Sequence, residues 1–128
     1  MISTWRKWLS FKPAVLVAAG ITVVSLWEAP QVPPALGLSD KTIHTLMYAL
    51  LALTLMAAFL AVSRTRIAYY PMVCACVTLY GGLMELLQHC CTVTRSAEWA
   101  DLLADFLGAV IGLLIIAIVH VSALRHRA

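Results

Sequence analysis

Residues 39–62 read SDKTIHTLMYALLALTLMAAFLAV, and this stretch decides what kind of protein the chain can be. From residue 46 onward it is almost wholly apolar. An apolar run of about 20 residues is long enough to cross the hydrocarbon core of a bilayer as a helix. Asp40, Lys41 and His44 nevertheless lie at its start. The stretch therefore predicts a membrane span with charged groups at one end.

The whole chain has the composition of an integral membrane protein. Of its 128 residues, 62% are hydrophobic and 12% are charged, with a mean hydropathy of +0.92. Soluble domains average about half apolar and a quarter charged residues. The net charge is only +3, and the basic residues are scattered between apolar segments, which excludes a nucleic-acid partner. A chain of this length is expected to form one domain, residues 1–128.

The fold class expected is all-α, an integral membrane bundle of four transmembrane helices. The predicted spans are residues 13–28, 42–62, 67–89 and 99–120. The N-terminus resembles a signal peptide, but Trp27, Glu28 and Pro30 stand where a cleavage site needs small residues. The first segment is therefore expected to remain as an uncleaved span.

The lysines and arginines fall unevenly on the two sides of the predicted bundle. Seven of the nine lie in the two terminal segments and in the loop between the second and third spans. The opposite side receives only Lys41 and Arg95. Because loops on the cytoplasmic side carry the excess of Lys and Arg, both termini are predicted to be cytoplasmic.

Polar residues that are unusual in a membrane span gather at the outward-facing ends of the last three spans. They are Asp40, Lys41, His44, Glu85, Gln88, His89, Arg95, Glu98, Asp101 and Asp105. A charged group near the centre of a membrane helix costs about 2.5–3.5 kcal/mol on insertion scales, so ionisable groups inside a span are by default functional candidates. The sequence therefore predicts a site on the outer face.

Helical spacing indicates which way these residues point. Asp40, His44 and Tyr48 are four residues apart and share one stripe of the second span. Asp101 and Asp105 share a stripe of the fourth span with two glycines, which form the small-xxx-small motif GAVIG at residues 108–112. Such a motif lets a neighbouring helix approach closely. The acids of the fourth span are therefore predicted to point into the bundle rather than into lipid.

The residue types allow two chemical interpretations of this site. In an enzyme, His44 is the general acid or base, and either Glu85 or Asp101 is the carboxylate that orients it. In a binding site, Lys41 and Arg95 meet an anionic head group. The full set of expected ligand-binding residues is Asp40, Lys41, Tyr48, Gln88, Arg95 and Asp105.

No metal ion or other cofactor is predicted, although a hydrolytic metal site of His44, Glu85 and Asp101 is a less favoured variant. The four cysteines, Cys74, Cys76, Cys90 and Cys91, indicate no disulfide framework.

The order of these motifs resembles the VanZ-like family of small bacterial membrane proteins. The matching pieces are DKTIHTLMYALLAL at 40–53, GGLMELLQ at 81–88, Arg95, and DLLADFLGAVIG at 101–112. The resemblance covers roughly residues 25–118, and Asp105 departs from the asparagine that is common in the family. It implies a multi-pass protein of the bacterial cytoplasmic (inner) membrane with a link to the cell envelope. The family takes its name from a protein associated with resistance to a lipid-tailed glycopeptide antibiotic.

Three functions remain open from the sequence. The favoured one is an envelope protein that binds a lipid-linked or amphiphilic molecule at the outer site and contributes to tolerance of glycopeptide antibiotics or envelope stress. The second is a membrane-embedded hydrolase or transferase that acts on a lipid-linked phosphate or glycan. The third is a structural or assembly subunit. The expected partners are membrane lipids and a lipid-linked envelope precursor, with a homo-oligomer as a further alternative.

Overall fold

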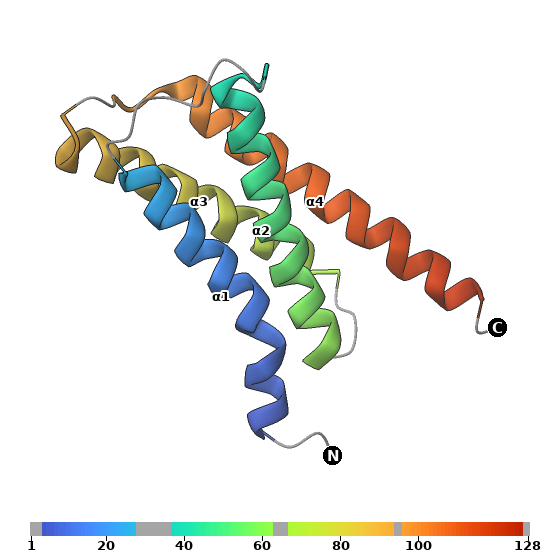
Figure 1. Cartoon of the computed structure of the whole chain (residues 1–128). Coiled ribbons are helices and arrows are strands. Elements are labelled where there is room, and N and C mark those ends of the chain that lie inside the picture. The colour runs from blue at the N-terminus through green and yellow to red at the C-terminus, as the bar shows by residue number, and fades with distance from the viewer. Residues whose placement is uncertain (1–3, 28–36, 63–66, 94–95, 127–128) are drawn as a thin grey trace.

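The computed structural model describes residues 4–27, 37–62, 67–93 and 96–126, and every regular element in these ranges is a helix. The helices are α1 (Thr4–Leu26), α2 (Asp40–Val62), α3 (Tyr69–Cys91) and α4 (Trp99–Arg125). They form an antiparallel bundle, in which α1 and α3 begin at the end where α2 and α4 finish (Figure 1). All four are long and apolar enough to cross a membrane. The all-α fold with four membrane-length helices is thus confirmed.

Helix α1 differs from the first predicted span. Its membrane-length part is Trp8–Leu26, whereas the sequence placed the span at 13–28, with residue 28 outside the described residues. Pro13 lies inside the helix and does not end it. A proline removes one main-chain hydrogen bond, and transmembrane helices tolerate this because neighbouring groups satisfy the freed carbonyl. The helix therefore continues through Pro13, and its membrane-length part begins at Trp8, before the apolar run from which the span was predicted.

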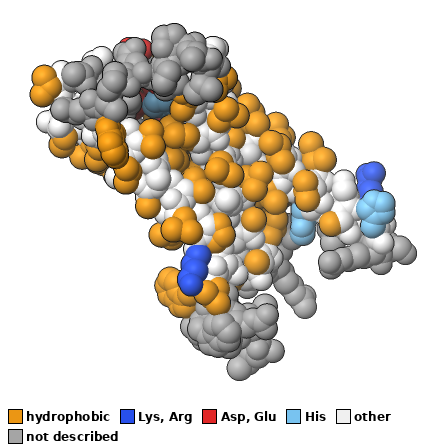
Figure 2. Space-filling model, in the orientation of Figure 1, with side chains coloured by type: hydrophobic (Ala, Val, Ile, Leu, Met, Phe, Trp, Pro, Cys, Tyr) orange, Lys and Arg blue, Asp and Glu red, His pale blue; other side chains and the backbone are white. Residues whose placement is uncertain are grey.

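The sides of the bundle are apolar. Large hydrophobic side chains such as Leu16, Leu79 and Ile118 are 72%, 73% and 66% exposed. Figure 2 shows hydrophobic side chains along the length of the molecule, with Lys and Arg near the ends of the chain and Asp and Glu at the opposite end. A soluble monomer rarely exposes so large an apolar surface, whereas lipid covers it in a bilayer. The chain is thus a multi-pass membrane protein.

Helices α2 and α4 are packed unusually closely along the glycines of α4. A Cβ atom at Gly108 would collide with the main-chain oxygen of Thr45, and one at Gly112 would collide with that of Ala49. The Thr45 hydroxyl lies 3.3 Å from the main-chain oxygen of Ala104, between the same two helices. The close approach predicted from GAVIG is confirmed, and it fixes the register of α2 against α4.

The start of α2 is capped by its own sequence. The main-chain N–H of Thr42 donates to the Ser39 hydroxyl oxygen at 3.2 Å, which satisfies one of the free N–H groups at the helix start. Asp40 occupies the first turn, where the helix dipole favours a negative charge. The polar residues at the beginning of residues 39–62 therefore cap the helix and also carry charge.

Candidate functional site

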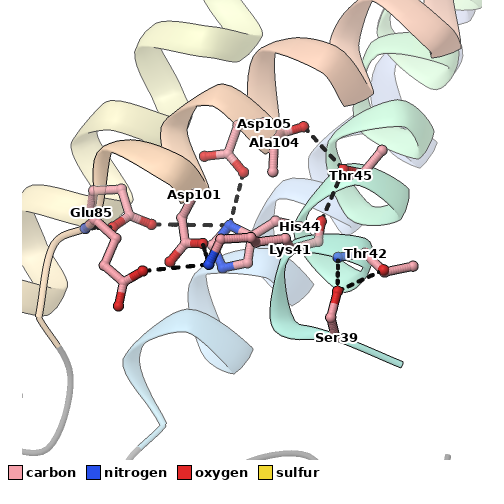
Figure 3. A network of polar contacts seen from close by, with 10 residues as sticks. Ser39, Lys41, Thr42, His44, Thr45, Glu85, Asp101, Ala104 and Asp105 are labelled. Atoms are coloured by element: carbon pink, nitrogen blue, oxygen red, sulfur yellow. Dashed lines mark hydrogen bonds and ion pairs between the residues drawn. The ribbon is translucent and has the colours of Figure 1, made fainter. Parts of the chain in front are cut away.

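The polar side chains meet at the end of the bundle where α2 and α4 begin and α3 ends (Figure 3). His44 comes from α2, Glu85 from α3, and Asp101 and Asp105 from α4. These four residues are only 4%, 5%, 6% and 0% exposed. The prediction that the acids of α4 point into the bundle is confirmed, and the three candidate catalytic residues lie in one cluster.

The imidazole of His44 is oriented by Asp105. Its Nδ1 lies 2.8 Å from Asp105 Oδ1, a hydrogen bond in which the ring N–H donates when His44 carries its proton on Nδ1. Glu85 Oε1 is further away, at 4.0 Å from the same nitrogen. The sequence analysis named Glu85 or Asp101 as the orienting or activating carboxylate; in the structure Asp105 lies closest to Nδ1. Asp105 lies one turn deeper in the bundle than Asp101, level with His44.

Glu85 uses its two oxygens differently. Oε2 accepts a hydrogen bond of 3.1 Å from the main-chain N–H of Glu98, the residue before α4. This contact ties the end of α3 to the beginning of α4 and satisfies an N–H at a helix start. Oε1 faces His44 and has no hydrogen-bond partner among the described residues.

Lys41 closes the outer rim of the cluster. Its Nζ lies 3.5 Å from Glu98 Oε2 and 3.6 Å from Asp101 Oδ1. The Lys41 and Glu98 side chains are about half exposed, at 53% and 54%. Exposed ion pairs contribute about 0–1 kcal/mol, so these contacts position the groups more than they stabilise the fold. The lysine charge is already shared between two carboxylates.

Three of the expected ligand-binding residues differ in where they lie relative to the cluster. Asp40 is exposed at the start of α2, yet its carboxylate lies within 4.8 Å of ligand atoms of His44 and Asp101. Gln88 is not part of the cluster, because its side-chain amide donates to the main-chain oxygen of Ser25 on α1 at 3.0 Å. Arg95 lies outside the described residues.

Tyr48 lies directly below the imidazole, one turn further along α2. Its ring stacks on that of His44 with a centroid separation of 6.2 Å and an interplanar angle of 15°. The residue is fully buried, and its hydroxyl has no hydrogen-bond partner in the part of the chain that the structure describes. Tyr48 therefore packs beside the imidazole with its ring nearly parallel to it, and adds a buried hydroxyl to this part of the bundle.

Gly81 makes room for the Asp105 carboxylate, a role that the sequence analysis missed. A Cβ atom at position 81 would collide with Asp105 Oδ2 and lie 3.0 Å from its Cβ and Cγ. Gly81 stands four residues before Glu85 and so shares its helix stripe. That spacing is the signal that could have revealed a small residue facing the site.

A groove of about 280 Å³ runs between α3 and α4 and reaches this cluster. Its apolar wall consists of Gly82, Leu86, Ala97, Trp99 and Leu102. Glu85 and Glu98 also line it. The groove thus joins an apolar surface on the side of the bundle to two carboxylates of the polar cluster.

Acids outnumber bases in the described part of the site. Asp40, Glu85, Glu98, Asp101 and Asp105 face only Lys41 and His44. Oxygens of three buried carboxylates, Glu85 Oε1, Asp101 Oδ1 and Asp105 Oδ2, have no hydrogen-bond partner among the described residues, although Lys41 Nζ lies 3.6 Å from the Asp101 oxygen. A buried carboxylate needs a donor or a counter-charge. The arrangement can therefore accept hydrogen bonds, hold a cation, or exchange a proton through His44.

No family model matches this chain, and neither a curated protein nor a solved structure is significantly similar to it.

Proposed function

We propose that the chain is a VanZ-like protein of the bacterial inner membrane that binds a lipid-linked or amphiphilic envelope molecule at the polar end of its helix bundle. In this role it contributes to tolerance of glycopeptide antibiotics or envelope stress. The observation that carries the proposal is the groove between α3 and α4, which leads from the lipid-facing side of the bundle to Glu85 and Glu98.

The groove has the two chemical halves that an amphiphile requires. Its wall of Leu86, Trp99 and Leu102 suits an acyl or prenyl chain, since these side chains offer no polar atom except the Trp99 indole N–H. The carboxylates of Glu85 and Glu98 suit a head group with hydrogen-bond donors, such as the hydroxyls of a sugar. Lys41, held beside Glu98, offers donors to the same head group from the rim.

The proposal requires that the cluster faces the outside of the cell, and two native cysteines test this orientation. Cys90 and Cys91 are exposed at the end of α3 that carries the cluster. A membrane-impermeant maleimide added to intact cells, permeabilised only in any outer membrane, is expected to label the wild type. The double variant Cys90→Ser/Cys91→Ser is expected to lose this label, and Cys74→Ser/Cys76→Ser to keep it. Labelling of Cys90 and Cys91 only in inverted vesicles would show the opposite orientation.

Filling the groove tests binding itself. Gly82 lies in its wall, and a Cβ added there would meet Leu102 only at an ordinary 3.7 Å. Gly82→Phe is therefore expected to fold and to place its ring in the groove. Mass spectrometry of the lipids that co-purify with the protein is expected to show about a tenfold loss of the specifically bound species, equal to about 1.4 kcal/mol.

Gly20→Phe is the matched control for this experiment. Gly20 lies on the exposed side of α1, where an added Cβ finds no atom within 4 Å. This variant makes the same chemical change on a surface that contacts ordinary lipid. Its lipid profile is expected to equal that of the wild type. Identical profiles for Gly82→Phe and Gly20→Phe would contradict the proposal that the groove binds a lipid.

A membrane-embedded enzyme is the second candidate, and the hydrogen bond between His44 and Asp105 favours it. A carboxylate that fixes an imidazole at 2.8 Å is the arrangement by which a general base is oriented. An enzyme would convert the lipid that a binding protein only retains. Incubation of purified wild type with its co-purifying lipids would then yield product, and His44→Asn, which keeps a donor near Nδ1 but no base, would not.

A further inference from the structure

We infer that His44, Glu85 and Asp105 form a binding site for one divalent transition-metal ion of the zinc type. Each residue comes from a different helix, and their ligand atoms all lie within 4.8 Å of one another. Figure 3 shows the three side chains converging between α2, α3 and α4. The site is the deeper part of the polar cluster, below the rim that Lys41 closes.

The unsatisfied carboxylate oxygens are the first reason for this assignment. Glu85 and Asp105 are 5% and 0% exposed, and Glu85 Oε1 and Asp105 Oδ2 have no hydrogen-bond partner among the described residues. An acidic cluster on a surface could be satisfied by water, but these oxygens are enclosed by three helices. A doubly charged cation would neutralise both carboxylates at once.

The positive charge of the neighbouring Lys41 does not neutralise the inner carboxylates in place of such a cation. Lys41 is engaged by Glu98 and Asp101 at the rim, and its side chain is about half exposed. Among the described residues, the only basic side chain beside the inner carboxylates is the imidazole of His44. One imidazole can carry at most one positive charge, whereas two carboxylates face it.

The distances suit a metal ion of this class. Zinc bonds to nitrogen and oxygen of about 2.0–2.2 Å in tetrahedral geometry place neighbouring ligand atoms about 3.3 Å apart. His44 Nδ1 lies 2.8 Å from Asp105 Oδ1 and 4.0 Å from Glu85 Oε1, so the observed spacings lie on either side of that value. Ion binding needs only small side-chain shifts and the His44 tautomer that carries its proton on Nε2. One imidazole and two carboxylates leave a fourth position open.

The ligands are already held by surrounding groups. Glu85 is anchored through Oε2 by the main-chain N–H of Glu98 at 3.1 Å. The Asp105 carboxylate lies over Gly81, where a larger residue would displace it. The ring of Tyr48 stacks on His44. Such outer contacts fix ligand orientation in metal sites.

The ion would lie beside the head group that the groove accepts, because Glu85 belongs to both sites. To that extent the inference rests on the proposed function, since the ion would offer its open position to an oxygen of the bound molecule. Metal binding is nevertheless measured with zinc alone, in the absence of any added lipid. If the protein fails to bind zinc, the lipid result for Gly82→Phe still stands. If Gly82→Phe fails to change the bound lipid, the zinc result still stands.

Equilibrium dialysis followed by elemental analysis tests the inference. The full chain is purified without a polyhistidine tag, stripped with a chelator and dialysed against zinc. Cys76, Cys90 and Cys91 are changed to serine in every sample, because exposed thiols bind zinc by themselves. We expect one zinc per chain, and at least a tenfold weaker affinity in Asp105→Asn and in Glu85→Gln. Both variants keep the shape and a hydrogen-bond acceptor of the original side chain.

Asp101→Asn is the matched control, because Asp40, His44 and Asp101 form the competing group of ligand atoms at the rim. It is expected to keep the zinc. The melting temperature provides a second measurement: zinc should raise it in the parent and in Asp101→Asn, but not in Asp105→Asn or Glu85→Gln. Zinc binding that survives both inner variants, or that is lost only with Asp101→Asn, would overturn the inference, as would a parent that binds no zinc.

Discussion

Gly112→Ala is expected to destabilise the folded bundle by about 1–3 kcal/mol, the usual cost of inserting a group into closed packing. A Cβ atom at this position would collide with the main-chain carbonyl oxygen of Ala49 on α2. A flexible side chain could rotate away, but this carbonyl can move only if α2 moves. Because alanine is otherwise preferred to glycine in a helix by about 1 kcal/mol, the expected effect has the opposite sign to helix propensity.

Gly82→Ala is the matched control, since its Cβ would make an ordinary contact of 3.7 Å with a side-chain atom of Leu102. It is expected to keep or raise the stability by up to about 1 kcal/mol. Gly108→Ala, which meets the main chain of Thr45, is expected to behave like Gly112→Ala. Unfolding of the detergent-purified protein, followed by tryptophan fluorescence, measures all three. Equal shifts for Gly112→Ala and Gly82→Ala would contradict the close packing of α2 on α4.

The glycine contact also shows which features of the fold can be predicted from the sequence. The membrane spans were predictable because a segment that crosses a bilayer must be a long apolar helix. Few other structures satisfy the main-chain N–H and C=O groups inside the hydrocarbon core. The inward face of α4 was predictable as well, because Asp101 and Asp105 share a stripe with Gly108 and Gly112. In both cases the pattern of residues within a single helix is enough for the prediction.

Pairing between helices was not predictable in the same way. Whether His44 meets Glu85, Asp101 or Asp105 depends on how α2 is rotated and shifted against the other helices. Residues one turn apart share a stripe, so periodicity cannot choose between them. The groove escaped prediction for a related reason, because it arises where Gly82 leaves space opposite Leu102 on another helix.

Asp105→Ala is expected to be the most disruptive change in the polar cluster. It would remove the acceptor of the 2.8 Å hydrogen bond and leave the His44 N–H buried without a partner. An unsatisfied buried donor costs about 1–3 kcal/mol, and the space left beside Gly81 adds to that cost. Asp105→Asn keeps an acceptor oxygen and the same shape, so it is expected to melt close to the wild type. Thermal unfolding of the two purified variants compares them.

Removing both partners separates a structural role from a functional one. In His44→Phe/Asp105→Leu no buried polar group of the pair remains, and apolar replacements of buried polar or charged pairs are often neutral or stabilising. We expect this double variant to be clearly more stable than Asp105→Ala. If it also equals the wild type in stability, then the hydrogen bond is not needed to hold the bundle together. A polar pair kept at membrane depth without a gain in stability is then explained by what it binds. If instead the double variant is as unstable as Asp105→Ala, the pair is a structural link between α2 and α4, and the third function, that of a structural subunit, gains support.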